Sequence, residues 1–386
     1  MKSPSRRGLA VWGLVCLVAT GGAPAQRGQL PALRALDVEP AGGICELLSP
    51  ATVVVPASGD PLAPRAARSP YLRLFHDRGR HELVIDVGPV DLPPHSMAEH
   101  SEELVYQLMH VPFDAWVHGY RAELSDAQGA RVPRRVLHHI DTTRPAARDL
   151  FLPVAQRFVA LGAESEAQNL PAWLAGVRLR RGEPLLVSTM LHNPTATPYS
   201  GVRVRLVLQY TETRPLREVA GFRVDVMFPT GPMEFDLPPG RTVRSWDGSP
   251  AVPARILGLS GHLHRYAEWM ELRDLTARRV IWRARPRTDA SGEVTSMPVS
   301  LPHLGLGRVV YPTHRYRITA SYFNPTGHTI PEGGMAKVGG IFTPVAPLPE
   351  VAVGDPLYQA DIRHLLGLRC DPGGMGGMMA HAAHSE

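Results

Sequence analysis

The amino-acid sequence predicts an all-β protein, and three observations support that class. The 386 residues include 38 prolines and 36 glycines, a content typical of short strands joined by tight turns and unusual for helical bundles. Several segments alternate apolar and polar residues with a period of two, as half-buried strands do. Helical patterns, in contrast, are few. Because 44% of the residues are hydrophobic, the chain has ample material for a core, and wholesale disorder is excluded.

The strand patterns begin near residue 70 and recur along the chain. Residues 81–90 form a mixed apolar run that ends in a proline-rich turn. Residues 116–123, 202–209 and 316–322 each alternate between two kinds of side chain, with arginines on the polar side of 202–209. Such an alternation predicts antiparallel strands with one buried face and one wet face, at the spacing of a β-sandwich.

One helix and one internal echo are also predicted. Residues 164–175 are the best helical candidate, although Pro171 is expected to break the helix. Residues 191–195 and 323–327 both contain Asn-Pro-Thr after an apolar run, and Asn-Pro favours a turn. An echo this short is compatible with chance, and it is also what two similar β-domains would produce. We place the domain boundary near residue 213.

The predicted organisation therefore has five parts. Residues 1–25 form a leader and residues 26–68 an extended lead-in. Residues 69–213 and 214–350 form two β-domains, and residues 351–386 form a tail. A length of this order favours two domains over one or three.

The leader has the three regions of a secretory signal peptide. It begins with the positive residues Lys2, Arg6 and Arg7, continues with an apolar stretch over 9–19, and ends with small residues at 23–25. An N-terminal membrane anchor is the alternative, but the apolar stretch is short for a full span. We therefore expect a secreted or periplasmic protein. Its two mature cysteines, Cys45 and Cys370, would either pair in that compartment or remain free thiols.

Charge and hydropathy limit the partners of the mature chain. Removal of the leader lowers the formal net charge from +5 to +2, which does not support a nucleic-acid-binding surface. No later segment has the ~18 uninterrupted apolar residues of a membrane span, so no span is expected in the mature chain. Only Lys2 and Lys337 are lysines among 41 basic residues, which we attribute to codon bias.

Three of the 17 histidines are candidate ligands in the first predicted domain. His138 and His139 are adjacent, and neighbours on a regular strand point to opposite faces, so one ion could take both only at a strand end or a bulge. His192 follows the apolar run 185–191. Taken singly, the pair is also compatible with a solvated loop, and His192 with an ordinary strand-end residue.

The second predicted domain carries a sharper signal. His262 and His264 are two residues apart after an apolar run, and on a strand both imidazoles share one face, where they can converge on one ion. Imidazole suits several transition metals. Met335 lies in a glycine-rich stretch, where its thioether is either a soft copper ligand or part of the core. The alternative for the two histidines is an exposed strand face without a metal.

The order of these residues resembles a known family. A His-His pair, a histidine after an apolar strand, a His-x-His motif and a methionine in a glycine-rich loop are similar to the ligands of the copper type II, ascorbate-dependent monooxygenases. That family includes peptidylglycine α-hydroxylating monooxygenase and dopamine β-monooxygenase. The resemblance covers roughly residues 100–345. It implies two antiparallel, jelly-roll-like β-sandwich domains that face each other across an open cleft, with one copper in each.

The resemblance also implies a division of labour between two coppers per chain. The copper of His138, His139 and His192 would store and pass an electron. The copper of the catalytic set would bind dioxygen and insert one oxygen atom into a substrate C–H bond, and ascorbate or another donor would reload both. The substrate, a small molecule or a peptide, is not assigned by the resemblance. The catalytic set consists of His262, His264 and Met335.

Two further functions remain open from the sequence. The chain could be a copper-binding protein of the same fold that serves in storage, delivery or sensing, and the tail would suit that role because thioethers with imidazoles can hold copper in transit. A disordered Gly/Met tail is the alternative. The chain could also be a metal-free sandwich that binds a ligand or partner. The residues that crowd the tail are Met375, Met378, Met379, His381 and His384.

Overall fold

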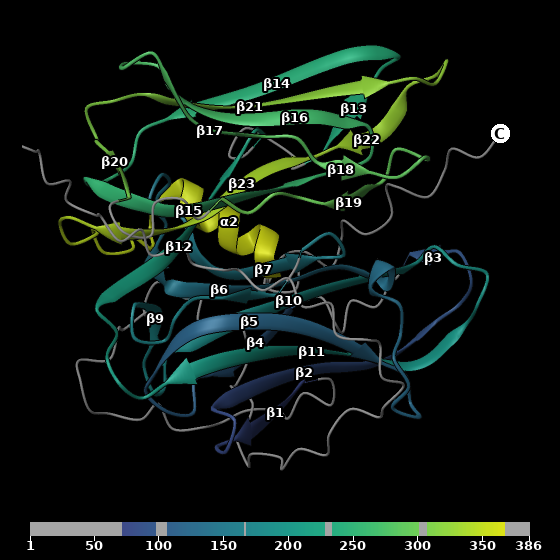
Figure 1. The fold of residues 1–386 in the computed structure, drawn as a ribbon, viewed down its shortest axis with the longest axis horizontal. Coiled ribbons are helices and arrows are strands. Elements are labelled where there is room, and N and C mark those ends of the chain that lie inside the picture. Colours follow the sequence, from purple (N-terminus) through teal and green to yellow (C-terminus); the bar gives the residue numbers. More distant parts are fainter. Residues whose placement is uncertain (1–71, 98–105, 166, 228–233, 301–306, 367–386) are drawn as a thin grey trace, which may run out of the picture.

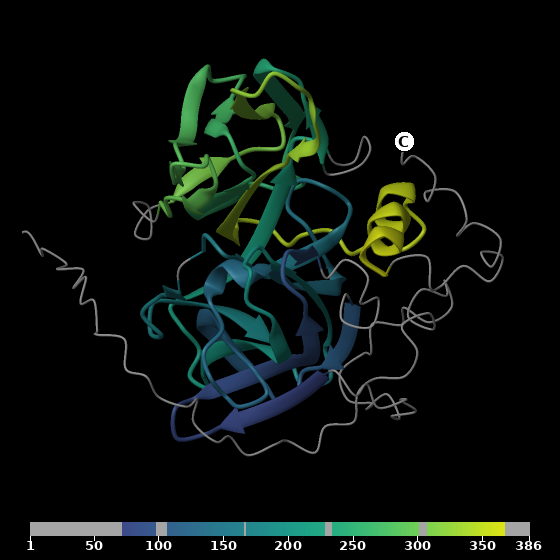
Figure 2. The same ribbon diagram turned by 90° about the vertical axis from the view of Figure 1, so that its right-hand side faces the viewer.

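The computed structural model describes residues 72–97, 106–165, 167–227, 234–300 and 307–366, and it confirms the all-β class (Figure 1). Regular structure within these ranges consists of strands, one short 3-10 turn and one α-helix. Strands form two lobes, one built mainly from the first half of the chain and one from the second (Figures 1 and 2).

The elements of the first half end with a long strand that contains Val204. They are β1 (Leu72–Asp77), β2 (Glu82–Leu92), β3 (Ser96–Met97), β4 (Tyr106–His110), β5 (Ala115–Ser125), η3 (Arg134–Val136), β6 (Leu137–Arg148), β7 (Ala155–Gly162), β8 (Gln168–Asn169), β9 (Ala175–Leu179), β10 (Pro184–Asn193) and β11 (Tyr199–Thr211).

The elements of the second half end with the α-helix. They are β12 (Arg217–Asp225), β13 (Phe235–Leu237), β14 (Gly240–Gly248), β15 (Ala254–Leu263), β16 (Ala267–Asp274), β17 (Arg279–Ala284), β18 (Arg287–Thr288), β19 (Val294–Ser296), β20 (Arg308–Val310), β21 (Tyr316–Asn324), β22 (Ile330–Gly334), β23 (Ala336–Pro344) and α2 (Pro356–Leu366).

The largest sheet runs through both lobes without a break. Its strand order is β1-β2-β11-β5-β9-β12-β23-β15-β20, with β8 paired to β5. The lobes join where β9 pairs with β12, and this pair is parallel, whereas its neighbours in the sheet are antiparallel. A second sheet, β3-β10-β6-β7 with β4 on β10, faces the first half of the large sheet, and β14-β21-β16-β17 faces the second half.

Each lobe has its own apolar core. The first core lies between the two sheets of the first lobe and includes Ile85, Val204 and Leu206. The second includes Met270 and Phe342. The partition does not follow the sequence strictly, because the link between β6 and β7, residues 150–154, packs into the second core. The two lobes are thus joined by shared packing as well as by the shared sheet.

The alternation patterns are confirmed as strands. In β11 the apolar residues of 202–209 are buried and the arginines between them are partly exposed, and β21 buries Tyr316, Ile318 and Ala320 on one face. The predicted helix over 164–175 is wrong, because the described residues of this segment form turns, β8 and the start of β9. The helix of the structure lies instead at Pro356–Leu366, inside the segment predicted as a tail.

The Asn-Pro-Thr echo folds into the same turn twice. Asn193 donates from Nδ2 to backbone carbonyls, and its Oδ1 accepts from the backbone N–H and the hydroxyl of Thr195. Asn324 does the same with Thr326 and with the carbonyl of His328. Each turn begins at the last residue of a strand, and the first one fixes the backbone directly after His192.

Several sequence predictions concern residues outside the described ranges. The predicted leader (1–25), the lead-in (26–68), Cys45, Cys370 and the Met/His segment of the tail all lie there. In the part of the chain that the structure describes, no helix is long and apolar enough to cross a membrane.

Candidate metal centre

The His-His pair lies at a β-bulge. Along β6 and β10, His139 is paired with Met190 and Leu137 with Leu191, so His138 is an extra residue on β6. A bulge of this kind breaks the strict alternation of side chains. The two imidazole centres are 5.3 Å apart, which shows that both rings lie in one neighbourhood.

The other three histidines come from strand ends that meet this bulge. His192 is the penultimate residue of β10, next to β6 in the same sheet. His262 lies near the end of β15, and His264 follows the last residue of that strand. The His262 and His264 ring centres are 5.2 Å apart, as the shared strand face predicts.

His138 is the centre of the resulting cluster. Its ring centre lies 5.6 Å from that of His192, 6.4 Å from that of His262 and 5.8 Å from that of His264. The two predicted ligand sets are therefore brought together at the junction of the lobes and are not held apart by an open cleft. We call His138, His139, His192, His262 and His264 the histidine cluster.

Met335 lies beside this cluster along the sheet. In the ladder between β15 and β23, His262 faces Lys337 and Leu263 faces Ala336, and His264 and Met335 are the residues next to that last pair. Met335 is only 3% exposed, and among the described residues it belongs to neither apolar core.

A buried tyrosine links the backbones of these two candidate ligands. The phenol of Tyr322 accepts a hydrogen bond from the backbone N–H of His264, 3.2 Å away, and donates one to the carbonyl oxygen of Met335. Burial raises the pKa of Tyr322 well above its usual value, so the phenol keeps the proton that it donates. Tyr322 therefore fixes the spacing of two chain segments that are distant in sequence.

Glu164 orients the imidazole of His262. One carboxylate oxygen of Glu164 lies 2.8 Å from Nδ1 of His262, and the carboxylate is buried. Burial on its own would raise the pKa of Glu164, but the neighbouring His262 and the hydrogen bond from it hold that pKa below its usual value. Nδ1 of His262 therefore faces the carboxylate and Nε2 faces away from it, as in carboxylate–histidine–metal arrangements.

Burial keeps the other four imidazoles neutral. Burial lowers the pKa of His138 to about 3, and the neighbouring histidines add to that shift. Burial also lowers the pKa of His139 to about 4, although the negative charge of Asp141 acts in the opposite direction. Burial also lowers the pKa values of His192 and His264. At neutral pH these side chains are therefore unprotonated, which is the form that binds metal ions.

Unpaired nitrogens test whether these residues fit a metal. Nδ1 of His139, Nδ1 of His192 and Nε2 of His264 are buried without a hydrogen-bond partner. The nearest carboxylate oxygen to His139, on Asp141, is 3.5 Å away, which is long for a hydrogen bond. In the described ranges, however, no three His, Cys, Asp or Glu side chains already surround a common point. The donors fit copper in kind and neighbourhood, and their rings would have to turn to share an ion.

A pocket of about 220 Å³ lies against the cluster, at the junction of the two lobes. His139 and His262 form part of its wall, next to Glu164 and Lys337. Most of the remaining wall is apolar and comes from both halves of the chain. Examples are Val117, Phe158, Leu161, Leu259, Met297 and Ile341.

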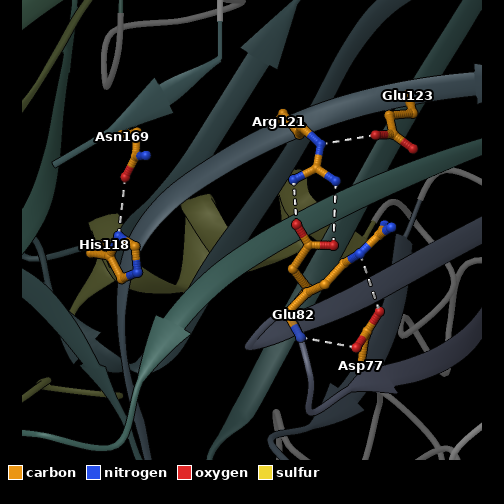
Figure 3. A network of polar contacts seen from close by, with 7 residues as sticks. Asp77, Glu82, His118, Arg121, Glu123 and Asn169 are labelled. Carbon is orange, nitrogen blue, oxygen red and sulfur yellow. Dashed lines mark hydrogen bonds and ion pairs between the residues drawn. The ribbon is translucent and has the colours of Figure 1, made fainter. Parts of the chain in front are cut away.

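His118 also lines this pocket. Its Nδ1 donates toward the side-chain oxygen of Asn169 (Figure 3) and the carbonyl oxygen of Leu170, each 3.1 Å away, so Nε2 is the ring nitrogen that these contacts leave unused. Arg121, on the same strand, forms a fork to Glu82. Arg121 lies between Tyr120 and Ala122, which pack against the core, so the arginine belongs to the outer face of the sheet.

Lys337 supplies a positive charge beside His262. It is directly paired with His262 across the ladder and lines the pocket. Burial lowers its pKa, and Arg223 adds to the shift. No role is predicted for this lysine from the sequence, where the scarcity of lysine is explained by codon bias.

Sequence reasoning missed Glu164, Tyr322, His118 and Lys337. Glu164 was assigned to a helix that does not form. The contact of Glu164 with His262 spans 98 residues, and no local pattern reports it. His118 and Tyr322 were noted only as members of alternating strands. The scarcity of lysine was the one available signal for Lys337.

The comparisons with known proteins identify no family for this chain. No family model and no curated protein matches the chain. Among solved structures, the peptide:N-glycanase PNGase F is 9% identical, with a TM-score of 0.36, over 70% of this chain and 97% of that one. PNGF-II is 10% identical, with a TM-score of 0.35, over 68% of this chain and 66% of that one. Likenesses this low assign neither a fold family nor an activity, so the resemblance to copper monooxygenases stays a prediction.

Proposed function

We propose that this protein is a secreted or periplasmic copper-dependent monooxygenase that hydroxylates a C–H bond of a small-molecule or peptide substrate, using dioxygen and an ascorbate-like reductant. The observation that carries the proposal is the meeting of five predicted histidine ligands, from three strands and both halves of the chain, beside a pocket of about 220 Å³. The described residues contain one such gathering of imidazole rings.

The residues that would hold copper are those of the histidine cluster together with Met335. Bound copper would supply one-electron redox chemistry and dioxygen activation. Imidazole and thioether ligands together suit a copper that cycles between Cu(I) and Cu(II). Glu164 keeps the proton of His262 on Nδ1 and so presents Nε2 to the cluster.

The pocket would hold the substrate next to these ligands. Its apolar wall excludes water from the reacting C–H bond and favours an apolar substrate body. Nε2 of His118 can accept a hydrogen bond from a substrate hydroxyl or amide, which would orient the substrate in the pocket. The ammonium group of Lys337 adds a positive potential at the end nearest His262.

The alternative is a non-catalytic copper-binding protein of the same fold. Burial of the nitrogens of His139, His192 and His264 favours it, because a storage or delivery protein has to keep its ion away from solvent. The pocket favours the enzyme, since an ion carrier has no need of a substrate-sized apolar cavity next to its ligands.

The deciding experiment measures copper content first and oxygen consumption second. The parent chain should take up copper and consume dioxygen with ascorbate, and His262→Ala should lose that consumption. His328→Ala changes an exposed histidine outside the cluster and is the matched control. Copper without reductant-dependent oxygen uptake would favour the carrier. A parent chain that takes up no copper would refute both functions and leave a metal-free binding protein.

A further inference from the structure

Three imidazoles of the histidine cluster form a closed triangle that crosses the junction of the lobes. The ring centres of His138 and His264 are 5.8 Å apart, those of His138 and His262 are 6.4 Å apart, and those of His262 and His264 are 5.2 Å apart. His138 comes from the bulge of β6, and the other two come from the end of β15. All three pairs of rings are therefore in contact.

Two of these separations, 5.2 Å and 5.8 Å, match imidazoles around one ion, and the third, 6.4 Å, is slightly longer. Metal–nitrogen bonds of about 2.0–2.1 Å place the centres of two imidazoles bound to the same ion about 5–6 Å apart. The rings of His138 and His262 would have to turn and move closer together to meet that spacing, since in the described ranges no three such side chains already surround a common point. Two of the required nitrogens have no hydrogen-bond partner that competes with an ion: Nε2 of His264 is buried without one, and the contact of Glu164 is to Nδ1 of His262 and not to Nε2.

The set predicted for the first copper is less complete. His138 is in ring contact with His139 and with His192, but in the described ranges the rings of His139 and His192 meet each other only through His138. An ion held by those two residues would therefore require a larger rearrangement. The ring of His138, in contrast, also contacts the rings of His262 and His264 in the other lobe.

We propose that His138 is a ligand of the second site, so that one metal ion is held by His138, His262 and His264 across the junction of the two lobes, with Met335 beside it. The inference rests on the proposed function in taking copper as the ion, and it changes the assignment of one ligand. A bridging ion ties the bulge of β6 to the end of β15. The site then exists only while the two lobes are in contact.

The test starts from a variant that keeps only the proposed ligands. In His139→Ala/His192→Ala the residues His138, His262, His264 and Met335 remain, and this chain should still bind one Cu(I), measured by competition with a chromophoric chelator. Adding His138→Ala should weaken Cu(I) binding by roughly tenfold or more, since even outer-shell partners of a metal contribute about 10–100-fold. Adding His328→Ala in the same background is the control and should leave the affinity unchanged.

A second measurement counts ligands directly. Pulsed EPR of the Cu(II)-loaded background variant should detect three coordinated imidazoles, and the added His138→Ala should reduce that number to two. Far-UV circular dichroism and the melting temperature of the metal-free variants show whether each one folds. Unchanged affinity and an unchanged imidazole count after His138→Ala would overturn the proposal, as would a folded background variant that binds no metal.

The outcome is separable from that of the proposed function. Oxygen consumption plays no part in the test, so a chain that binds Cu(I) in this pattern but consumes no dioxygen keeps the bridging site and loses the monooxygenase. If the chain does not bind copper, a titration with Zn(II) tests the same three histidine ligands. The same loss on adding His138→Ala would then support the bridging site with a different ion.

Discussion

The C-terminal helix α2 fastens the two lobes through one buried ion pair, and removing that pair should be costly. After β23 of the second lobe the chain continues into α2, which lies beside the lobes (Figure 2). There Asp361 of α2 meets Arg157 of β7 in the first lobe. The two guanidinium nitrogens of Arg157 lie 2.5 Å and 3.0 Å from the carboxylate oxygens. The side chains are 8% and 1% exposed, and the carboxylate also accepts from the backbone N–H of Ala155.

Asp361→Ala leaves the guanidinium of Arg157 buried without its counter-ion. Breaking one partner of a buried pair costs about 3–5 kcal/mol, because the remaining charge is uncompensated. Asp247→Ala is the matched control. The pair of Asp247 with Arg317 has the same fork, at 2.6 Å and 2.8 Å, but its side chains are 20% and 44% exposed. Exposed pairs contribute about 0–1 kcal/mol.

Urea unfolding followed by tryptophan fluorescence gives the free energy of unfolding of each variant. Asp361→Ala should lower it by several times the loss in Asp247→Ala. If α2 detaches locally instead, the loss appears as faster hydrogen exchange of the helix amides. Equal free energies in the two variants, with unchanged exchange in α2, would refute the role of the ion pair.

Three shorter predictions concern the candidate site and the core. Met335→Leu conserves volume and should cost under ~1.5 kcal/mol, yet weaken Cu(I) binding in a chelator competition; equal affinity would return Met335 to the core. Glu164→Gln should weaken metal binding by about 10–100-fold without unfolding the chain, and retained affinity would contradict an orienting role for its contact with His262. Burial raises the pKa of Asp149 to about 6, above the ~3.9 of an unfolded chain, so the folded state holds an extra proton and should lose up to ~3 kcal/mol as the pH rises from 4 to 7. Asp149→Asn should flatten that slope in urea titrations, and an identical slope in parent and variant would count against it.

The strands were predictable because their signal is local. In β11 and β21 the identity of each residue reports the face on which it lies, and a two-residue period is visible without any knowledge of the partner strand. The same rule predicted that His262 and His264 would share a face, and that one ion could take both His138 and His139 only at a strand end or a bulge. The ring contact of His262 with His264 agrees with the first expectation, and the register places His138 at a bulge, whereas metal binding stays a prediction.

The helices were not predictable because contacts between residues distant in sequence decide where they form. Residues 164–175 have helix-favouring composition, but Glu164 is tied to an imidazole 98 residues away, and Pro171 lies within the segment. In α2 the buried positions include Asp361 together with Tyr358 and Ile362. A buried carboxylate in the apolar stripe obscures the helical period, and only its tertiary partner explains why it is there.

The convergence of the two histidine sets follows from how the lobes are joined. A parallel pair between β9 and β12 makes one continuous sheet, and β7 of the first lobe packs directly on β12 of the second. That packing requires glycine at position 221, where a Cβ atom would lie 2.4 Å from the carbonyl oxygen of Arg157. Because β7 is the neighbour of β6 in its sheet, the close approach also brings the bulge at His138 toward β15. Gly221→Ala should therefore separate the lobes locally and weaken Cu(I) binding, although residue 221 is not a candidate ligand. A chelator competition that finds equal affinity in Gly221→Ala and in the parent chain would show that the cluster does not depend on this contact.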